Sequence, residues 1–197
     1  MRQYLILLML LVNLPAVADT DIYSIDNTHS FASFKIRHVV SKTTGTFPDI
    51  TGKILIDRSD LSKSSVEAKI NVMSVNSNHA RRDAHIREKA EYLDATKFAW
   101  MTFVSTKIEA ITQDEGLLTG KLTLHGVTKE ISFPFKMLGF GSDPWGAQRA
   151  GFEAHTVIKA SDYGFVWASQ PKSPVGDDIE ITLLIEGIKK HQDLKPL

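Results

Sequence analysis

The sequence predicts an all-β domain, built as one antiparallel sandwich or barrel with a single helical excursion. The first observation is that about eight segments of strand length alternate apolar and polar residues. The second is that short stretches rich in Gly, Pro, Asn and Asp separate them, as in strands joined by tight turns. The third is that a single convincing helical stretch, Arg81–Leu93, has many helix formers and no Gly or Pro. Alternation alone does not choose between a sandwich and a barrel.

The most clearly specified element is a β-hairpin over Leu117–Phe135, with His125-Gly126 as its two-residue turn. Glycine supplies the positive φ that such a turn needs, and histidine tolerates this region better than most residues. In this register Leu124 lies opposite Val127, and one face of the hairpin is apolar except for one lysine. The other face pairs threonine with threonine and lysine with glutamate, which stabilise a solvated face. The apolar face requires a sheet that covers it.

The other strands follow from the same alternation, in chain order. They are Ile22–Asp26, His29–His38, one bent region made of Thr43–Phe47 and Thr51–Asp57, Ser65–Val72, Trp100–Ile108, Gly151–Lys159 and Asp178–Gly187. Pro48 lies between two of them and cannot donate to a strand ladder, so a break is expected there. Gly139–Gly146 is expected to be a loop and Asp162–Pro174 to be irregular. The domain is expected over residues 19–190, followed by a polar tail at 191–197.

The first 18 residues predict a cleavable secretory signal peptide. Arg2 precedes the apolar run Tyr4–Val12, and Ala16-Val17-Ala18 is an A-x-A cleavage site, with cleavage expected after Ala18. The run of nine residues is too short to span a bilayer, and no transmembrane segment is expected. The chain has no cysteine, which excludes disulfides and a lipid-modified N-terminal cysteine. Lys and Arg equal Asp and Glu at 23 each, so net charge gives no reason to expect nucleic acid or an anionic membrane surface.

Several short motifs occur in a characteristic order. They are Asp26-Asn27-Thr28-His29-Ser30, Gly45-Thr46-Phe47, Arg82-Asp83-Ala84-His85-Ile86, Gly120–Ile131 (GKLTLHGVTKEI), Gly151-Phe152-Glu153-Ala154 and Asp162-Tyr163-Gly164. Together they resemble the YceI-like family from roughly Asp21 to Ile188. The resemblance implies an extended lipocalin-like β-barrel of eight antiparallel strands. It also implies a periplasmic protein, associated with stress responses, whose apolar tunnel binds a polyisoprenoid or related amphiphilic lipid.

The candidate ligand-binding residues are the apolar side chains that alternation places inside the sheet. They are Phe34, Ile36, Ile54, Val66, Ile70, Trp100, Leu122, Leu124, Phe133, Phe135, Phe152, Ile158, Ile181 and Leu183. Such a set forms either a packed core or the wall of a cavity. The resemblance favours a cavity that holds a polyisoprenoid, an isoprenoid quinone or a fatty-acid-like lipid. On its inward face, the bulk of Trp100 is expected to shorten this tunnel.

Further candidates come from the irregular segments and from the helix. Phe165 and Trp167, together with Trp145, are expected either to cover the mouth of the barrel as a lid or to plug its end. Arg82 and His85 are expected to share one face of the helix. They either contact the ligand's head group or tie the helix to the barrel. Arg149 has the same two interpretations.

Motifs for other chemistry are missing from the sequence. The seven histidines show no H-E-x-x-H spacing and no cysteine partner, so neither a metal site nor a cofactor is expected. There is no G-x-S-x-G motif and no phosphate-binding glycine loop, and no catalytic residue is predicted. Two alternatives to lipid binding stay open: an enzyme that acts on a lipid through Arg82, Asp83 and His85, and a filled-core scaffold with a protein partner. A homodimer is compatible with the sequence.

The match to the family pattern has two departures. Ala99 stands where family members often have proline, and Ala160-Ser161 precedes Asp162 without the arginine that they often carry there. If that arginine helps to hold a head group in relatives, the polar end of the ligand differs here.

Overall fold

The computed structural model describes residues 20–190; the predicted signal peptide at residues 1–18 and the predicted polar tail at 191–197 lie outside the described residues. The strands are β1 (Thr20–Ile25), β2 (Phe31–His38), β3 (Ser41–Phe47), β4 (Ile50–Asp57), β5 (Ser65–Asn71), β6 (Trp100–Ala110), β7 (Glu115–Leu124), β8 (Val127–Ser142), β9 (Gln148–Lys159) and β10 (Val175–Lys189). The α-helix is α1 (Ala80–Glu88), and short 3-10 turns lie at Leu61–Lys63, Val72–Ser74, Ala160–Tyr163 and Val166–Ser169.

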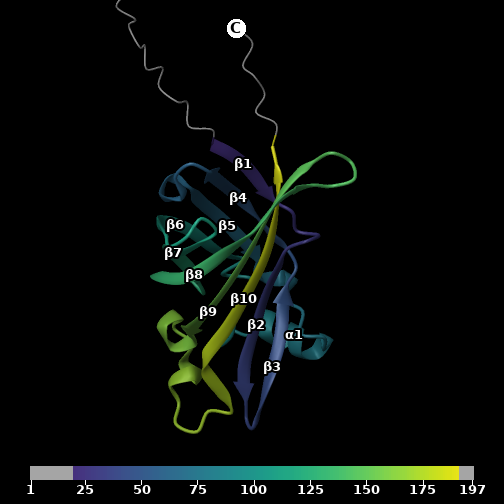
Figure 1. Ribbon diagram of the computed structural model, residues 1–197. Helices are drawn as coiled ribbons and strands as arrows, with labels where there is room; N and C mark the ends of the chain where they lie inside the picture. The colour runs from purple at the N-terminus through teal and green to yellow at the C-terminus, as the bar shows by residue number, and fades with distance from the viewer. Residues whose placement is uncertain (1–19, 191–197) are drawn as a thin grey trace, which may run out of the picture.

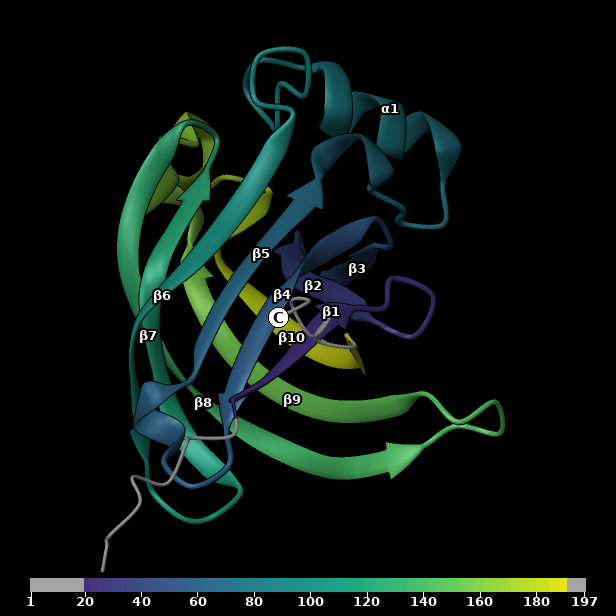
Figure 2. The ribbon, with the colours of Figure 1, turned by 90° about the horizontal axis from the view of Figure 1, so that it is seen from above.

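Eight of the strands close into a barrel. The order is β1-β4-β5-β6-β7-β8-β9-β10, every pair is antiparallel, and β10 pairs again with β1. Figure 2 shows the ring from above, with α1 beside it. This closure confirms the predicted eight-stranded antiparallel barrel with one helix and decides against a sandwich.

Strands β2 and β3 make the barrel longer on one side. Strand β10 pairs with β1 through Gly187–Lys189 and with β2 through Val175–Leu184, so β2 continues the line of β1 along the same edge. Strand β3 ends at Phe47 and β4 begins at Ile50, which confirms the break predicted at Pro48. Together with α1 and the β9–β10 connection, the β2–β3 turn forms one end of the molecule, here called the helix end (Figure 1).

The β7–β8 hairpin has the predicted register and turn. Leu124 pairs with Val127 and Thr123 with Thr128, whose hydroxyls are 2.8 Å apart. His125 and Gly126 have φ angles of 52° and 76°, as expected for this type of two-residue turn. The apolar face of the hairpin closes over the barrel interior, which explains why its register is so strongly specified.

Two elements differ from the prediction. The helix ends at Glu88 rather than Leu93, because Lys89 takes an extended conformation and residues 89–95 fold back along the helix. Leu93 N donates to Ile86 O at 3.0 Å, which returns Leu93 and Tyr92 to the barrel.

The second difference concerns the Gly139–Gly146 segment, which is not simply a loop. Strand β8 continues to Ser142, and the register with β9 shifts between Met137 and Gly139, where φ is 138°. The glycine marks a β-bulge in a long arm that projects from the barrel, and only the tip is a turn (Figure 2). The Asp143 carboxylate holds that turn by accepting from Trp145 N and Ala147 N.

The buried residues form three clusters along the barrel. One surrounds Tyr23 and Ile56 where β1 begins, one surrounds Ile108 and Phe133, and one surrounds Tyr163 and Phe165 at the helix end. The clusters lie against the barrel wall and leave its interior unfilled, and this unfilled space is the candidate site.

Candidate functional site

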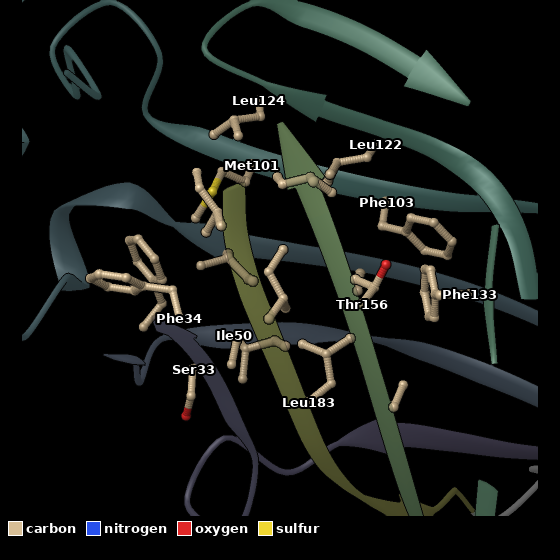
Figure 3. A pocket seen from close by; sticks show the side chains of 18 of the residues that line it. Ser33, Phe34, Ile50, Met101, Phe103, Leu122, Leu124, Phe133, Thr156 and Leu183 are labelled. Atoms are coloured by element: carbon tan, nitrogen blue, oxygen red, sulfur yellow. The ribbon is translucent and has the colours of Figure 1, made fainter. Parts of the chain in front are cut away.

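The barrel encloses a long apolar cavity of about 690 Å³. All eight strands of the ring contribute to its wall. One residue from each is Ile25, Ile54, Val66, Met101, Leu122, Phe133, Phe152 and Leu183. Figure 3 shows apolar side chains from several strands around the space. Because a barrel of this size either fills with side chains or holds one ligand, the open interior indicates a binding cavity.

The predicted apolar site residues line this cavity, with one exception. The lining residues among them are Phe34, Ile36, Ile54, Val66, Ile70, Leu122, Leu124, Phe133, Phe135, Phe152, Ile158, Phe165, Trp167, Ile181 and Leu183. The polar candidates Arg82 and His85 also line it, at the helix end.

The prediction for Trp100 was wrong. Its side chain is 43% exposed on the outside of β6, where Lys69 Nζ lies 4.7 Å from the ring centroid. The register of β6 and β7 shifts between Ser105 and Lys107, so alternation does not continue through this point. Trp100 and Val104, which alternation places on the same face as Ile108, therefore point outward before the bulge. Trp100 does not shorten the cavity.

Alternation also missed residues that line the wall. Met101 and Phe103 point inward from β6, and the Phe103 ring lies 5.5 Å from that of Phe133. Met101 and Phe103 are two residues apart, which is the period of one face of a strand. The alternation of Met101 and Phe103 was the sequence signal that could have identified them as lining residues. The bulge hid this signal, because it made the face of Trp100 appear continuous with Ile108.

The arginine and histidine residues of the cavity wall gather at the helix end. His79, Arg81, Arg82 and His85 of the α1 region line it there, and so does His38 of β2. At this end a ligand would meet cationic and imidazole groups, whereas the rest of its length would contact hydrocarbon.

The Arg82-Asp83 motif fixes α1 to the segment before it. Arg82 Nε donates to Ser77 Oγ at 2.7 Å, and its Nη2 donates to Ser77 O at 2.6 Å. Asp83 is 7% exposed and accepts from Ser77 N at 2.8 Å. Burial alone would raise the pKa of Asp83, but the hydrogen bonds from Ser77 and His79 and the charge of Arg82 lower it overall. These contacts support the interpretation that Arg82 ties the helix to the barrel.

A chain of ring contacts, one stacked and the others tilted or edge-on, lies in the wall at the helix end. Along it, ring centroids are 4.8 Å apart for Phe98–His125, 4.7 Å for His125–Phe165, 5.6 Å for Phe165–Trp167, 5.9 Å for Trp167–Tyr92 and 5.1 Å for Tyr92–His85. Trp167 Nε1 also donates to Glu91 O at 2.8 Å, which joins this segment to the helix region. Phe165 is buried, as in a plug, and Trp167 lines the cavity nearby.

Trp145 does not belong to this aromatic set. It lies at the tip of the β8–β9 arm and is 87% exposed. The sequence prediction grouped Trp145 with Phe165 and Trp167 because all three lie in segments expected to be irregular, but the arm carries Trp145 to the opposite end of the barrel (Figure 1).

Arg149 organises an ion network near the base of that arm. Its guanidinium contacts Asp26 at 2.8 Å and Asp143 at 2.9 Å, and it also contacts Glu186. Burial acts to raise the pKa of Asp26, but hydrogen bonds from Thr28, His29 and Arg149 hold it well below its usual range.

Within the described residues, one group has the composition of a metal site, because ligand atoms of Asp26, His29 and Glu186 lie within 4.8 Å of one another. Arg149 Nη1 already supplies the positive charge between the two carboxylates. Arg149 and the Asp26-x-x-His29 motif therefore act as a structural tie.

Within residues 20–190, no helix is both long and apolar enough to cross a membrane. The described helix, α1, is short and polar.

Comparison with known proteins places the chain in a family. The family model described as the YceI-like domain matches residues 23–187. Protein YceI of Salmonella arizonae is 40% identical over 171 residues, covering 85% of this chain and 87% of its own. A YceI protein of Campylobacter jejuni has a solved structure that superposes with a TM-score of 0.70 at 30% identity, covering 77% of this chain and 88% of its own. A polyisoprenoid-binding domain of Saccharophagus degradans shares the fold, with a TM-score of 0.64 at 17% identity, covering 85% and 98%. The chain therefore belongs to the YceI-like family.

Proposed function

We propose that this protein binds a long-chain amphiphile and carries or sequesters it in the periplasm. The ligand class is a polyisoprenoid, an isoprenoid quinone or a fatty-acid-like lipid. The observation that carries the proposal is the cavity of about 690 Å³, whose wall along the barrel is mostly apolar and whose arginine and histidine residues lie at the helix end.

The physical basis is the burial of hydrocarbon. A chain that leaves water for this cavity gains roughly 0.8 kcal/mol per buried methylene, so a long tail binds without a charged anchor. The polar groups at the helix end then orient the ligand, because a head group loses less hydration there than among Leu and Phe side chains. The length of the buried tail therefore determines the affinity for the ligand, and the polar groups at the helix end determine which way the ligand points.

The family supports this ligand class. The related domain from Saccharophagus degradans is described as polyisoprenoid-binding and has the same fold. We extend that ligand class to this chain because the cavity lining is of the kind that such a tail requires.

The contacts of the helix motif favour binding over catalysis. Both the Asp83 carboxylate and the Arg82 guanidinium are engaged by Ser77, and His85 packs edge-on against Tyr92. These partners give the motif a structural task that needs no reaction, so we do not assign it a catalytic role.

The periplasmic location rests on residues 1–18 of the sequence. It predicts that protein recovered from the periplasmic fraction begins at Asp19. Sequencing the N-terminus of the purified protein tests this, and a mature chain that still begins at Met1 would contradict it.

The binding proposal is tested with two neighbouring substitutions on β9. Thr156 lines the cavity, whereas Val157 points outward (Figure 3 labels Thr156). Thr156→Trp places a large ring inside existing space and is expected to reduce uptake of a fluorescent polyisoprenoid or fatty-acid probe by about tenfold or more. Val157→Trp adds the same ring outside and is expected to leave uptake unchanged. Equal uptake by both variants would place the probe somewhere other than the cavity.

A further inference from the structure

The charges of this protein are balanced in number but not in position. The segments that bound the helix end of the cavity are 36–43, 78–93 and 165–175. They carry seven lysines and arginines (Arg37, Lys42, Arg81, Arg82, Arg87, Lys89 and Lys172) against three acidic residues, Asp83, Glu88 and Glu91. Asp83 is buried, and Lys42 is paired with Glu180 of β10. The segments around the helix end of the cavity are therefore basic in a chain whose net charge is zero.

Exposed apolar side chains lie at the same end. Val39 and Val40 form the tip of the β2–β3 hairpin, and Val40 is 97% exposed. Val166 is 68% exposed and stands between Phe165 and Trp167, which both line the cavity. Val39 has a φ of 51°, a conformation that is a genuine outlier for a β-branched residue. Gly or Asn would fit this turn without strain, so folding alone does not explain two exposed valines there.

The two loops that carry these valines are joined. Val39 N donates to Pro174 O at 2.6 Å. The Arg37 guanidinium donates to Ser173 O at 3.1 Å, Pro174 O at 3.4 Å and Val39 O at 3.3 Å. These acceptors are neutral carbonyls, so Arg37 links the loops and keeps its charge. We call residues 37–42 and 165–174 together the rim.

We propose that the rim docks on the surface of a bilayer that contains anionic phospholipid, with the helix end of the cavity facing the lipid. Val39, Val40 and Val166 enter the interface, and Arg37 and Lys172 lie against the phosphates. This inference rests on the proposed function, because a tail that enters the cavity has to leave a membrane first. In this arrangement the lipid enters the barrel through the helix end.

The chemistry favours a bilayer over a protein partner. The apolar contribution is a few small side chains at loop tips, whereas a stable protein interface needs a contiguous area on the order of 1,000 Å². Basic residues near an anionic leaflet are attracted without any need for matching shape, and the attraction adds up over several lysines and arginines. The valines at the loop tips and the basic side chains around them are therefore better suited to an anionic bilayer than to a protein surface.

The test is co-sedimentation of the full-length mature protein with two kinds of vesicles, phosphatidylcholine alone and phosphatidylcholine with an equal amount of phosphatidylglycerol. We expect binding to the anionic vesicles that weakens as salt is raised, because exposed charges are screened. Val40→Asp and Lys172→Glu are each expected to lower the partition coefficient by about tenfold.

Two matched controls lie at the other end of the barrel. Ile111→Asp changes an exposed side chain in the β6–β7 turn, and Lys190→Glu changes an exposed cation just after β10. Both are expected to bind vesicles like the unchanged protein. The proposal is overturned if the rim variants bind as well as the controls, or if the unchanged protein ignores anionic vesicles. A rim that instead captures a protein and leaves vesicles unbound also overturns it.

Lipid content, measured separately by extraction of the same samples, distinguishes this inference from the proposed function. If the protein contains lipid but does not sediment with vesicles, the proposed lipid-binding function stands and the docking surface is ruled out. Protein that sediments through the rim but never contains or takes up lipid retains the docking surface and loses the proposed ligand.

Discussion

Asp83 shows how a single buried residue holds the wall of the cavity in place. Its carboxylate accepts hydrogen bonds from Ser77, and Arg82 beside it donates to the same serine. The contacts anchor α1, and α1 in turn places His85 at the cavity. A sequence motif that suggested head-group chemistry therefore acts first through the position of the helix.

This role predicts a pH-dependent loss of stability in Asp83→Asn. The pKa of Asp83 is lowered in the folded protein, so its ionised form contributes stability above the unfolded pKa and loses it as pH falls through the folded pKa. We expect Asp83→Asn to reduce the free energy of unfolding by about 1–3 kcal/mol at pH 7. Urea unfolding from pH 7 to pH 3 measures whether the difference from the unchanged protein narrows at acidic pH, as predicted.

The matched control is Glu88→Gln, an exposed position on the same helix. It should change the free energy of unfolding little at any pH. A deficit of Asp83→Asn that stays constant from pH 7 to pH 3 would show that the carboxylate's charge is not what anchors the helix.

At the scale of elements, the parts of the fold that the sequence predicted are those whose two faces differ in chemistry. The register and turn of the β7–β8 hairpin were predicted correctly, because one residue of slip would exchange its apolar and polar faces. Strand β6 was misread because its bulge changes the phase of alternation and leaves no trace in composition. The β8–β9 arm was read as a loop because glycine marks a bulge and a turn equally. The alternation of apolar and polar residues could not predict the cavity, because the same inward-facing residues can either line a cavity or fill a core.

The hairpin turn supplies a test at this scale. Gly126 has φ 76°, and a Cβ there would lie 2.4 Å from the Phe98 ring, whereas at Gly146, with φ 91°, nothing lies within 4 Å of an added Cβ. Gly126→Ala combines backbone strain with overlap, and we expect a loss of about 2–4 kcal/mol. Gly146→Ala carries the strain alone, with about 1–2 kcal/mol expected. Thermal unfolding of both variants checks the order, and an equal loss would mean that the Phe98 contact is not restrictive.

At the scale of the whole molecule, the two ends of the barrel differ. The end where β1 begins is held by buried Tyr23 and by the Arg149 ion network at the base of the arm. The helix end carries the arginine and histidine lining, the chain of ring contacts and the basic rim. Net charge concealed this asymmetry in the sequence, because segments far apart in the chain supply the basic surface and only the fold brings them together.

The central claim is that the barrel holds a long lipid tail, and the native mass of the protein tests it most directly. The protein is purified from the periplasm without detergent, weighed under native conditions, and then extracted with organic solvent for mass spectrometry of the extract. The account predicts a mass above that of the mature chain by one lipid of defined mass, which the extract then identifies. A native mass equal to that of the chain alone, with no uptake of added polyisoprenoid or fatty-acid probes, would contradict the account.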